Sequence, residues 1–337
     1  DYLRADYPTC VAARRHWVVA DGTDDGRLLW RQPGAAAMSN WGVLWRSLRA
    51  GVPDDRYHDG TIVRRVAPRD DHVEITLDDG AAARTDVLIG ADGYHSTVRE
   101  IVAGDARPHY AGYILWRGNF PESRLADRNA IDRLDADEAW LTVAIDGGHA
   151  VMYPIPDFDD GFAAGERRIN WAFYAPQPTA LRLDGPSSIP PGAVAEDVHA
   201  ALPRLLDEVM PRNLRPLFDS PAEEVSIQPV YDESVDHYVR GRVALIGDAG
   251  SLSRPHTGSG ATKAMQDARC LEALGTDAEG WDPLLAAYDH DRAATGRTLV
   301  ELGRRIGRDQ VEHTPPWASM SEADFEAWAQ ASLSGEQ

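Results

Sequence analysis

A glycine-rich stretch in the last third of the chain combines residues that could bind an anion and a set of hydroxyl groups. Gly247 and Asp248 follow a short apolar run at residues 243–246, and a second segment, Pro-His-Thr-Gly-Ser-Gly, runs from Pro255 to Gly260. Glycines let a ligand approach backbone N–H groups closely, and the helix dipole favours negative charge at a helix start. We therefore expect Asp248 to bind the hydroxyl groups of a ligand, beside a helix end that binds an anionic group.

The elements around this stretch are a strand and a helix. The apolar run predicts a buried parallel strand, and open α/β sheets bind ligands at the carboxyl ends of such strands. The apolar residues that follow recur at the spacing of one helical face; they are Ala261, Ala264, Met265, Ala268 and Leu271. An ordinary strand-loop-helix with a glycine turn is the alternative reading of this pattern.

A second motif lies upstream, at residues 86–99. A strand ends there in Gly-Ala-Asp92-Gly93, and Ser96-Thr-Val-Arg99 follows. In their order and separation the two motifs resemble the flavin-contacting signatures of single-component FAD-dependent aromatic monooxygenases, whose fold is that of para-hydroxybenzoate hydroxylase. Three strings look most like the 2,6-dihydroxypyridine hydroxylase branch of that family: YAGYILWRG at residues 110–118, YPIP at 153–156 and PHT at 255–257.

The resemblance implies an α/β fold. We expect a discontinuous Rossmann-like FAD-binding domain at residues 31–107 and 232–309, an antiparallel β-sheet substrate domain at 1–30 and 108–231, and a C-terminal helical tail at 310–337. Members of the family begin with a βαβ unit whose G-x-G-x-x-G loop holds the FAD pyrophosphate. That pattern does not occur in this sequence, which opens at Asp1 without an initiator methionine. We expect that the family's first ~60 residues are missing here, and that the complete protein binds FAD.

Further elements follow from local pattern. A hairpin is predicted at residues 11–30, a helix with core-facing tryptophans at 40–49, and a small β-meander at 61–89. Strands at 110–118, 141–145, 150–155 and 169–174 have no helices of their own between them, which favours a separate sheet. Helical patterns cover residues 198–217 and 283–306. A last helix is predicted to start at Ser321, where Asp324 completes a capping box.

The resemblance also implies which residues bind the cofactor. Asp248 would hold ribityl hydroxyls, and Asp92 would contact the ribityl or pyrophosphate region. The amides at the helix start would stabilise anionic reduced flavin, and Pro255 would shape a pocket that excludes water. The full expected set is Gly247, Asp248, Pro255, Gly258, Ser259, Gly260, Ala261, Asp92 and Gly93. Arg99 is expected either to pair with phosphate or to form a structural salt bridge.

The implied reaction is hydroxylation of an electron-rich aromatic or N-heterocyclic small molecule. In the family NADPH or NADH reduces the flavin and O2 then adds to form a C4a-hydroperoxide; no side chain can supply this chemistry. A proton-transfer base is plausible, with His256, Tyr153 and His149 as candidates. Tyr153, Trp171 and His256 are candidates for the substrate pocket. No metal is expected.

The composition of the chain argues against several classes of partner and location. A net charge of −20 argues against nucleic acid or an anionic membrane as partner. The two cysteines favour a reduced, cytoplasmic setting, no apolar run approaches membrane-spanning length, and a homodimer is possible. The rivals are a flavin-dependent dehydrogenase or reductase and a non-catalytic, degenerate flavoprotein that binds an aromatic ligand. A halogenase would need a W-x-W-x-I-P motif, which is absent.

Overall fold

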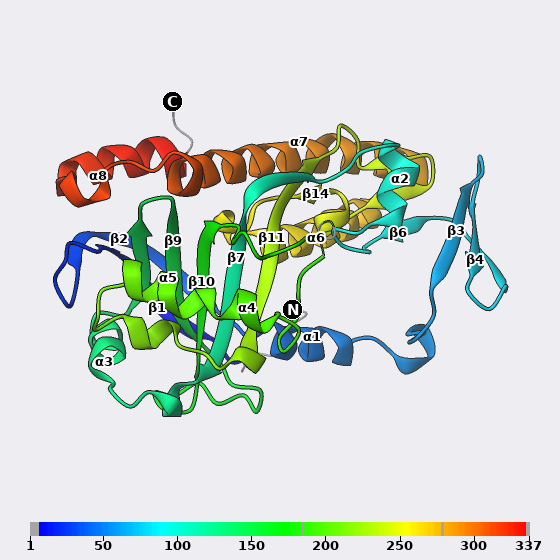
Figure 1. The fold of residues 1–337 in the computed structure, drawn as a ribbon. Helices are drawn as coiled ribbons and strands as arrows, with labels where there is room; N and C mark the ends of the chain where they lie inside the picture. Colours follow the sequence, from blue (N-terminus) through cyan, green and yellow to red (C-terminus); the bar gives the residue numbers. More distant parts are fainter. Residues whose placement is uncertain (1–6, 184, 186, 278–279, 335–337) are drawn as a thin grey trace. The chain divides into compact units, whose positions relative to one another are not determined.

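The computed structural model describes residues 7–183, 185, 187–277 and 280–334, and the chain divides into two compact units (Figure 1). The first, here called the sheet unit, comprises the described residues of Asp1–Tyr57, Gly112–Pro229 and Arg308–Gln337. The second, here called the motif unit because both sequence motifs lie in it, comprises His58–Ala111 and Val230–Gly307. The expectation about the chain start at Asp1 lies outside the described residues.

A large sheet forms the centre of the sheet unit. Its strands have the order β11-β7-β10-β9-β8-β1-β2. Strands β1 and β8 are parallel, whereas β1–β2, β8–β9, β9–β10 and β10–β7 are antiparallel. The strands are β1 (Cys10–Val19), β2 (Arg27–Met38), β7 (His109–Pro121), β8 (Ala139–Ile145), β9 (Gly148–Ile155), β10 (Arg168–Pro176) and β11 (Val225–Ser234). The predicted hairpin and separate sheet are confirmed, with two corrections: a helix at residues 129–136 lies between β7 and β8, and the pair β1–β8 is parallel in a sheet expected to be antiparallel.

Alternation along these strands gives the sheet two different faces. In β10, Ile169, Trp171 and Phe173 belong to the main hydrophobic core, while the residues between them point to the other face. The core is closed by Leu134 of α3 and Leu202 of α5. The helices of this unit are α1 (Trp41–Ala50), α3 (Asn129–Ala136), α4 (Glu196–His199), α5 (Ala201–Val209) and α8 (Glu322–Ala329) (Figure 1).

Helix α8 packs on the second face of this sheet. Its start has the predicted capping box, in which Ser321 and Asp324 exchange hydrogen bonds. Phe325 of α8 contacts Trp17 of β1, with ring centroids 5.1 Å apart. The predicted helix at residues 40–49 is present as α1, but its tryptophans do not lie in the core, because Trp41 is 73% exposed and Trp45 is 46% exposed.

The motif unit contains two small sheets. Strands β3, β4 and β5 form the predicted antiparallel meander, and β6 and β13 form a parallel pair with β12 at the edge. Their bounds are β3 (Val63–Pro68), β4 (Val73–Leu77), β5 (Ala82–Thr85), β6 (Leu88–Gly90), β12 (Val239–Arg240) and β13 (Val243–Leu245). A short strand, β14 (Ser251–Leu252), pairs with the end of β11.

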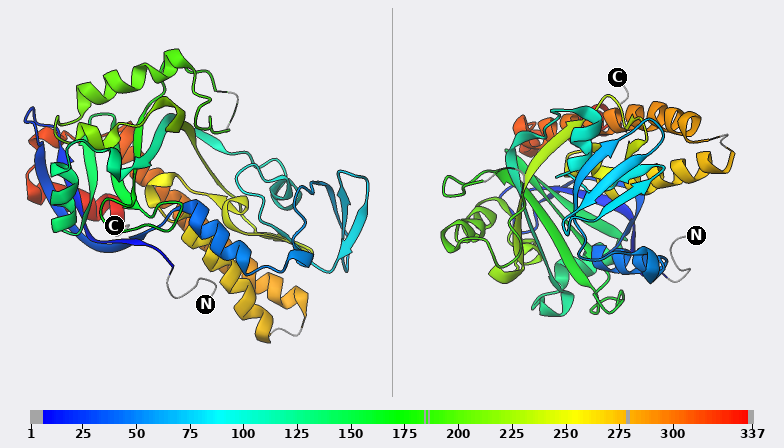
Figure 2. Two further views of the ribbon diagram at one scale, coloured as in Figure 1. Left: turned by 90° about the horizontal axis from the view of Figure 1, so that it is seen from below. Right: turned by 90° about the vertical axis from the view of Figure 1, so that its right-hand side faces the viewer.

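Two long helices, α6 (Gly260–Asp277) and α7 (Trp281–Gly307), lie side by side in the motif unit (Figure 2). A third, α2 (Thr97–Ala103), follows β6. The buried face of α6 differs from the predicted one. Ala261, Met265 and Ala268 are exposed, whereas Lys263 and Asp267 are buried. The reason is a cluster of buried charges between the first half of α6 and α7. In the second half of α6 the predicted apolar contact is present, because Leu271 and Leu274 pack against the core that contains residues of α7.

The units differ from the predicted domain boundaries in two places. Residues 31–57 group with the sheet unit rather than with the motif unit, because β2 pairs with β1 along its length. The C-terminal residues also join the sheet unit, because α8 and Trp317 pack against Trp17. None of the helices in the described part of the chain is long and apolar enough to cross a membrane.

Candidate functional site

The turn after β13 presents Asp248. Residues Gly247–Ala249 form one 3-10 turn directly after this buried strand. Gly247 has φ +59°, and a Cβ there would lie 3.2 Å from the side chain of Ala264. A positive φ and a close neighbour both require glycine. The local sequence therefore fixes Asp248 at the carboxyl end of a parallel strand, as predicted.

Two buried charged side chains bind the backbone of Gly247, one at its N–H group and one at its carbonyl. Asp267 Oδ2 accepts a hydrogen bond from the Gly247 N–H at 2.9 Å, and Lys263 Nζ donates to the Gly247 carbonyl at 2.7 Å. Lys263 and Asp267 are themselves paired at 2.9 Å, and Arg292 of α7 donates to Asp267 Oδ1 at 2.7 Å. The sequence analysis missed Lys263 and Arg292 as members of the site. The available signal was the opposite charge of Lys263 and Asp267 at the i,i+4 spacing of a helix.

The Asp248 carboxylate is available to a ligand. Burial raises the pKa of this carboxyl group, and the nearby charges of Lys263 and Arg99 lower it. Among the residues that the structure describes, none donates a hydrogen bond to its oxygens. A half-buried carboxylate of this kind can accept hydrogen bonds from the hydroxyl groups of a bound molecule.

The start of α6 lies beside Asp248. Residues Pro255–Thr257 form a 3-10 turn, Gly258 adopts the left-handed conformation with φ +61°, and α6 begins at Gly260. A Cβ on Gly260 would lie 3.9 Å from Asp248 Oδ1. The first N–H groups of a helix have no partner within it and carry the positive end of its dipole. The arrangement thus brings an acceptor for hydroxyl groups and a donor set for an anion together.

The loop that carries Pro255 and His256 is anchored by charge. Arg254, which is buried, donates to Asp232 at 2.8 Å, and Arg304 of α7 donates to the other oxygen of Asp232 at 2.8 Å. A Cβ on Gly303 would lie 3.0 Å from the Arg254 backbone nitrogen, so a larger residue would require this loop or α7 to shift. Pro255 and His256 are half-buried at the start of this anchored turn.

The second motif is tied to the first by Arg99. Its guanidinium donates to the carbonyls of Ala249 at 2.9 Å, Asp248 at 2.5 Å and Tyr94 at 3.1 Å. Arg99 is 2% exposed, and burial lowers its pKa, which the negative charges of Glu233, Asp92 and Asp248 offset in part. In place of the expected structural salt bridge, Arg99 makes hydrogen bonds with backbone carbonyl groups. Arg99 instead fixes the backbone on which Asp248 stands.

Asp92 caps helix α2. Its carboxylate accepts hydrogen bonds from the Ser96 hydroxyl at 2.5 Å and from the N–H groups of Thr97 and Val98 at 2.8 and 3.1 Å. Gly93 follows with φ +72°, a conformation that favours glycine. These contacts give Asp92 a structural role at the start of α2, as an aspartate ahead of Ser-Thr indicates; its contact with a flavin stays a prediction.

The predicted substrate-pocket residues are divided between the two faces of the large sheet. Tyr153 and His149 lie on β9 and share one face, where Tyr153 packs edge-on against Trp140 at 6.3 Å. His149 is 2% exposed and stacks on Tyr174 at 4.3 Å. Trp171 points to the opposite face, where it is fully buried and donates to Ser220 at 2.9 Å. His256 belongs to the motif unit.

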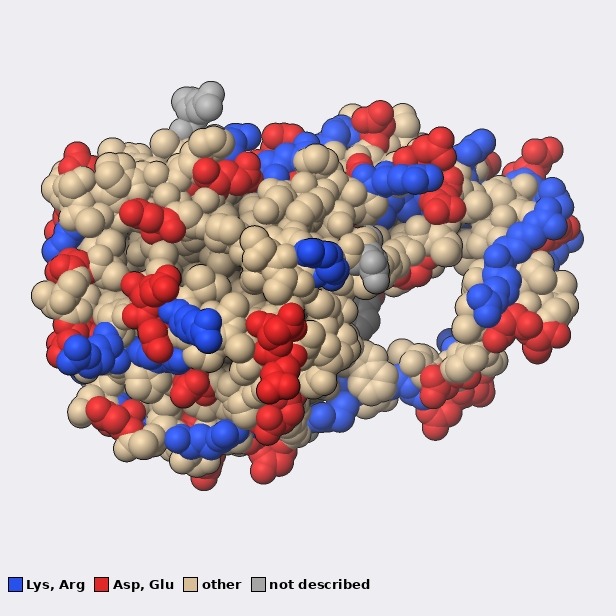
Figure 3. Space-filling model, in the orientation of Figure 1, with Lys and Arg blue, Asp and Glu red and all other residues tan. Residues whose placement is uncertain are grey.

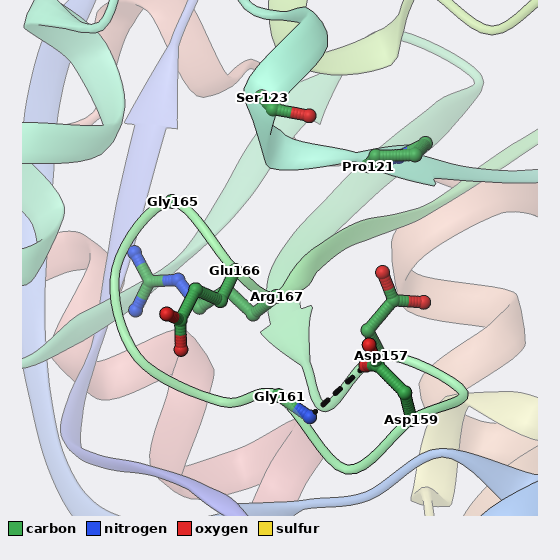
Figure 4. A pocket seen from close by; sticks show the side chains of 8 residues that line it. All are labelled: Pro121, Ser123, Asp157, Asp159, Gly161, Gly165, Glu166 and Arg167. Carbon is green, nitrogen blue, oxygen red and sulfur yellow. Dashed lines mark hydrogen bonds between the residues drawn. The ribbon is translucent and has the colours of Figure 1, made fainter.

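A cavity of about 420 Å³ in the sheet unit contains none of the predicted residues. It is lined by Asp157, Asp159, Glu166 and Arg167 among others (Figure 4). The Arg167 guanidinium points away from the two aspartates and pairs with Glu122 and Asp135 instead. A groove of about 560 Å³ between α6 and α7 is lined in part by Ser259 and Lys263.

Comparison with known families gives the class to which this arrangement belongs. Residues 195–302, which include the Asp248 turn and most of α6 and α7, match the model of the FAD binding domain. Residues 110–184, within the large sheet, match a model described as FAD binding domain-like. The fold and the site thus define an FAD-binding α/β protein.

Two relatives with named activities give a more specific comparison than the domain models. The chain is 31% identical over 283 residues to 3-amino-4-hydroxybenzoate 2-monooxygenase from Streptomyces cremeus, a match that covers 83% of this chain and 64% of that protein. It is 32% identical over 277 residues to 2,6-dihydroxypyridine 3-monooxygenase from Paenarthrobacter nicotinovorans, covering 77% and 65% respectively. The chain therefore spans less than two thirds of the length of these relatives.

Solved structures agree on the fold. The structure of 2,6-dihydroxypyridine-3-hydroxylase from Arthrobacter nicotinovorans superposes with a TM-score of 0.78 at 24% identity, covering 93% of this chain and 79% of that one. Klebsiella pneumoniae HpxO, solved with FAD and uric acid, superposes with a TM-score of 0.71. These structures agree with the fold, and over most of its length the chain is similar in sequence to FAD-dependent aromatic monooxygenases, as the two motifs indicated.

Proposed function

We propose that the protein containing this chain is an FAD-dependent monooxygenase. Its reaction would be hydroxylation of an electron-rich aromatic or N-heterocyclic small molecule with NADPH or NADH and O2. The observation that carries the proposal is the Asp248 carboxylate, which lies beside the start of α6 without a hydrogen-bond donor among the described residues. The names of the relatives, which act on an aminohydroxybenzoate and a dihydroxypyridine, support the substrate class.

The residues present fit FAD. Asp248 would accept hydrogen bonds from ribityl hydroxyls, and the N–H groups of Gly260 and Ala261 would hold the anionic edge of the reduced ring. Gly258 and Ser259 would shape the turn, because their N–H groups donate to the Pro255 carbonyl and the Thr257 hydroxyl. When bound, the flavin supplies the electron transfer and oxygen activation that side chains cannot. Pro255, on its anchored turn, would exclude water from the reacting centre. Gly93 would allow close approach of the backbone, and Asp92 would act by holding that backbone in place.

The second face of the large sheet is the proposed substrate side. Tyr153, Trp140 and Asn170 lie in neighbouring register positions and offer aromatic walls and an amide to a planar ring. Burial raises the pKa of Tyr153, so at neutral pH its hydroxyl is protonated and donates a hydrogen bond rather than acting as a base. His149 and His256 stay candidates for the proton transfer, while Trp171 is left out because it faces the core.

The test is spectroscopic and then catalytic. We expect the purified protein to show flavin absorption bands, and we expect NADPH or NADH oxidation to be stimulated by hydroxypyridines or hydroxybenzoates with formation of a hydroxylated product. Asp248→Ala should lower FAD occupancy while the far-ultraviolet circular dichroism stays unchanged. Stimulated oxidation without an oxygenated product would favour a reductase. A colourless protein that takes up no added FAD would contradict the proposal.

A further inference from the structure

Lysine occurs once in this sequence. Of its 34 basic residues, 33 are arginines, and the single lysine is Lys263 on α6. It is also among the least exposed charged residues, with 2% of its surface accessible. A chain that uses arginine at every other basic position must place lysine here for a physical reason, since arginine and lysine differ in shape and hydrogen bonding.

The reason lies in the contacts of the ammonium group. Lys263 Nζ lies 2.7 Å from the Gly247 carbonyl, 2.9 Å from Asp267 Oδ2 and 4.7 Å from the centre of the Tyr238 ring. These partners lie on different elements and surround the charge. A compact ammonium with three donors can serve all of them, whereas the flat fork of a guanidinium presents its donors in one plane.

Charge balance links this cluster to Asp248. Lys263 and Arg292 both pair with the carboxylate of Asp267, and Arg292 also lies 3.7 Å from the more exposed carboxylate of Asp291. An uncompensated buried charge is costly. The carboxylate of Asp248 is a further negative charge close to Lys263. Asp248 directly follows Gly247, whose carbonyl Lys263 contacts, and its Oδ1 lies by the start of α6, one turn before Lys263.

We propose that Lys263 is a positioning residue of the flavin site. It holds the Gly247 turn through the Gly247 carbonyl and serves as the counter-ion of Asp248. The inference rests on the proposed function in assigning Asp248 to FAD. Lys263 acts through Asp248 and the turn, without contact to the reacting atoms. Its partner Asp267 holds the opposite end of Gly247, so the two side chains together fix the direction in which Asp248 points.

The electrostatics of both groups agree with this pairing. Burial lowers the pKa of Lys263, Asp267 and Asp248 raise it, and Arg292 lowers it. At Asp248 burial raises the pKa, while Lys263 and Arg99 lower it. Without Lys263 only Arg99 would oppose the effect of burial on Asp248. The carboxyl group would then take up a proton at higher pH, and it would lose its capacity to accept two sets of hydrogen bonds.

The first experiment needs no flavin. Protein labelled with [13C]lysine gives a Lys263 resonance that is identified by its loss in Lys263→Met, and its pH titration reports the ammonium directly. We expect the midpoint to fall in Asp248→Asn, because the variant removes a negative charge that favours protonation of Lys263. An unchanged midpoint in Asp248→Asn would overturn the pairing. This variant keeps Lys263 in place, so the result stands even if Lys263→Met fails to fold.

The second experiment measures FAD binding in a double-mutant cycle. We expect Asp248→Asn and Lys263→Met each to raise the Kd of FAD by roughly tenfold to a hundredfold, the range for loss of a charge-assisted hydrogen bond. The double variant should bind no more weakly than Asp248→Asn alone. Independent losses that multiply would overturn the inference. Arg269→Met removes an exposed cation from the same helix and should leave the Kd unchanged.

The two experiments separate the two proposals. If the wild-type protein takes up no FAD, the proposed function fails, yet the titration of Lys263 still decides whether it is paired with Asp248. If FAD binds and the titration does not respond to Asp248→Asn, the proposed function stands and the role of Lys263 fails. Binding that weakens below neutral pH only in Lys263→Met would support the counter-ion role, because it reports protonation of Asp248.

Discussion

Arg99 illustrates how one side chain can serve a site that it does not line. Its guanidinium connects the loop after β6 with the turn after β13 through carbonyl groups that are 150 residues away in sequence. Arg99, for which the sequence predicted either a phosphate contact or a salt bridge, thus makes hydrogen bonds with backbone carbonyl groups. The three candidates therefore differ in their contacts: Asp92 caps a helix, Arg99 connects two loops, and Asp248 is the one proposed to accept hydrogen bonds from a ligand.

Replacement of Arg99 should loosen both motifs together. Arg99→Met leaves buried carbonyl groups without donors, and we expect a loss of about 3 kcal/mol in the free energy of unfolding. FAD affinity should fall as well, because the Asp248 backbone loses its hydrogen bond. Urea unfolding and FAD titration measure the two effects. Arg64→Met, an exposed arginine of the same unit, is the control, and an equally stable Arg99→Met would contradict the connector role.

At the scale of elements, one buried carboxylate holds together three segments of the sheet unit. Glu122, after β7, is fully buried and pairs with Arg167 at 2.6 Å and with Arg128 at 2.6 Å, while Arg167 also reaches Asp135 of α3. Burial by itself raises the pKa of Glu122, but the hydrogen bonds and charges of these arginines outweigh it and leave the pKa below its usual value. Stability from this network is therefore present above the unfolded pKa and is lost as the pH falls.

The matching prediction concerns Glu122→Gln. We expect it to destabilise the protein by about 3–5 kcal/mol at pH 7, since it removes the fully buried negative charge with which both Arg167 and Arg128 pair. The difference from wild type should be constant down to about pH 5 and should shrink below about pH 4.3, where the unfolded chain begins to take up the proton. Urea unfolding across this range measures it. Glu223→Gln, at an exposed position, should show no such pH dependence; a pH-independent loss in Glu122→Gln would contradict the charge network.

At the scale of the whole molecule, the dominant property is the net charge of −20. Acidic side chains are spread over the face seen in Figure 3, with arginines among them, and a band of arginine atoms follows β3 and β4 in the motif unit. NADPH and NADH are anions, so the summed field of the protein opposes their approach while local arginines favour it.

We expect the net negative charge of the protein to outweigh the local arginines when NADPH, the proposed reductant, approaches. The second-order rate constant for flavin reduction by NADPH should rise by about twofold or more between 10 and 150 mM salt, because the Debye length falls from about 30 to about 8 Å. Stopped-flow absorbance at several ionic strengths measures it. A rate constant that falls with added salt would contradict this expectation and point to steering by the arginines near β3.

The amino-acid sequence by itself determined the local structures. Glycine and aspartate after a short apolar run are sufficient for the turn that presents Asp248, and alternation gave the strands of the large sheet. Ser321 and Asp324 specified the start of α8. These features depend on neighbours within a few residues, whose preferences are the same wherever the segment lies. The family resemblance rested on such local motifs, and for that reason it was readable without the fold.

Only the tertiary structure decided which side chains meet. Register placed Tyr153 and Trp171 on opposite faces of the sheet, although both lie in strands that were predicted. The partners of Arg99 and the buried cluster of Lys263, Asp267 and Arg292 join positions far apart in the chain. The spacing of apolar residues predicted an apolar contact face for α6. In the structure Lys263 and Asp267 are buried there, and Arg292 of α7 pairs with Asp267. A buried ion can be recognised only when its partners are known, because burial of a charge is favourable solely in their presence.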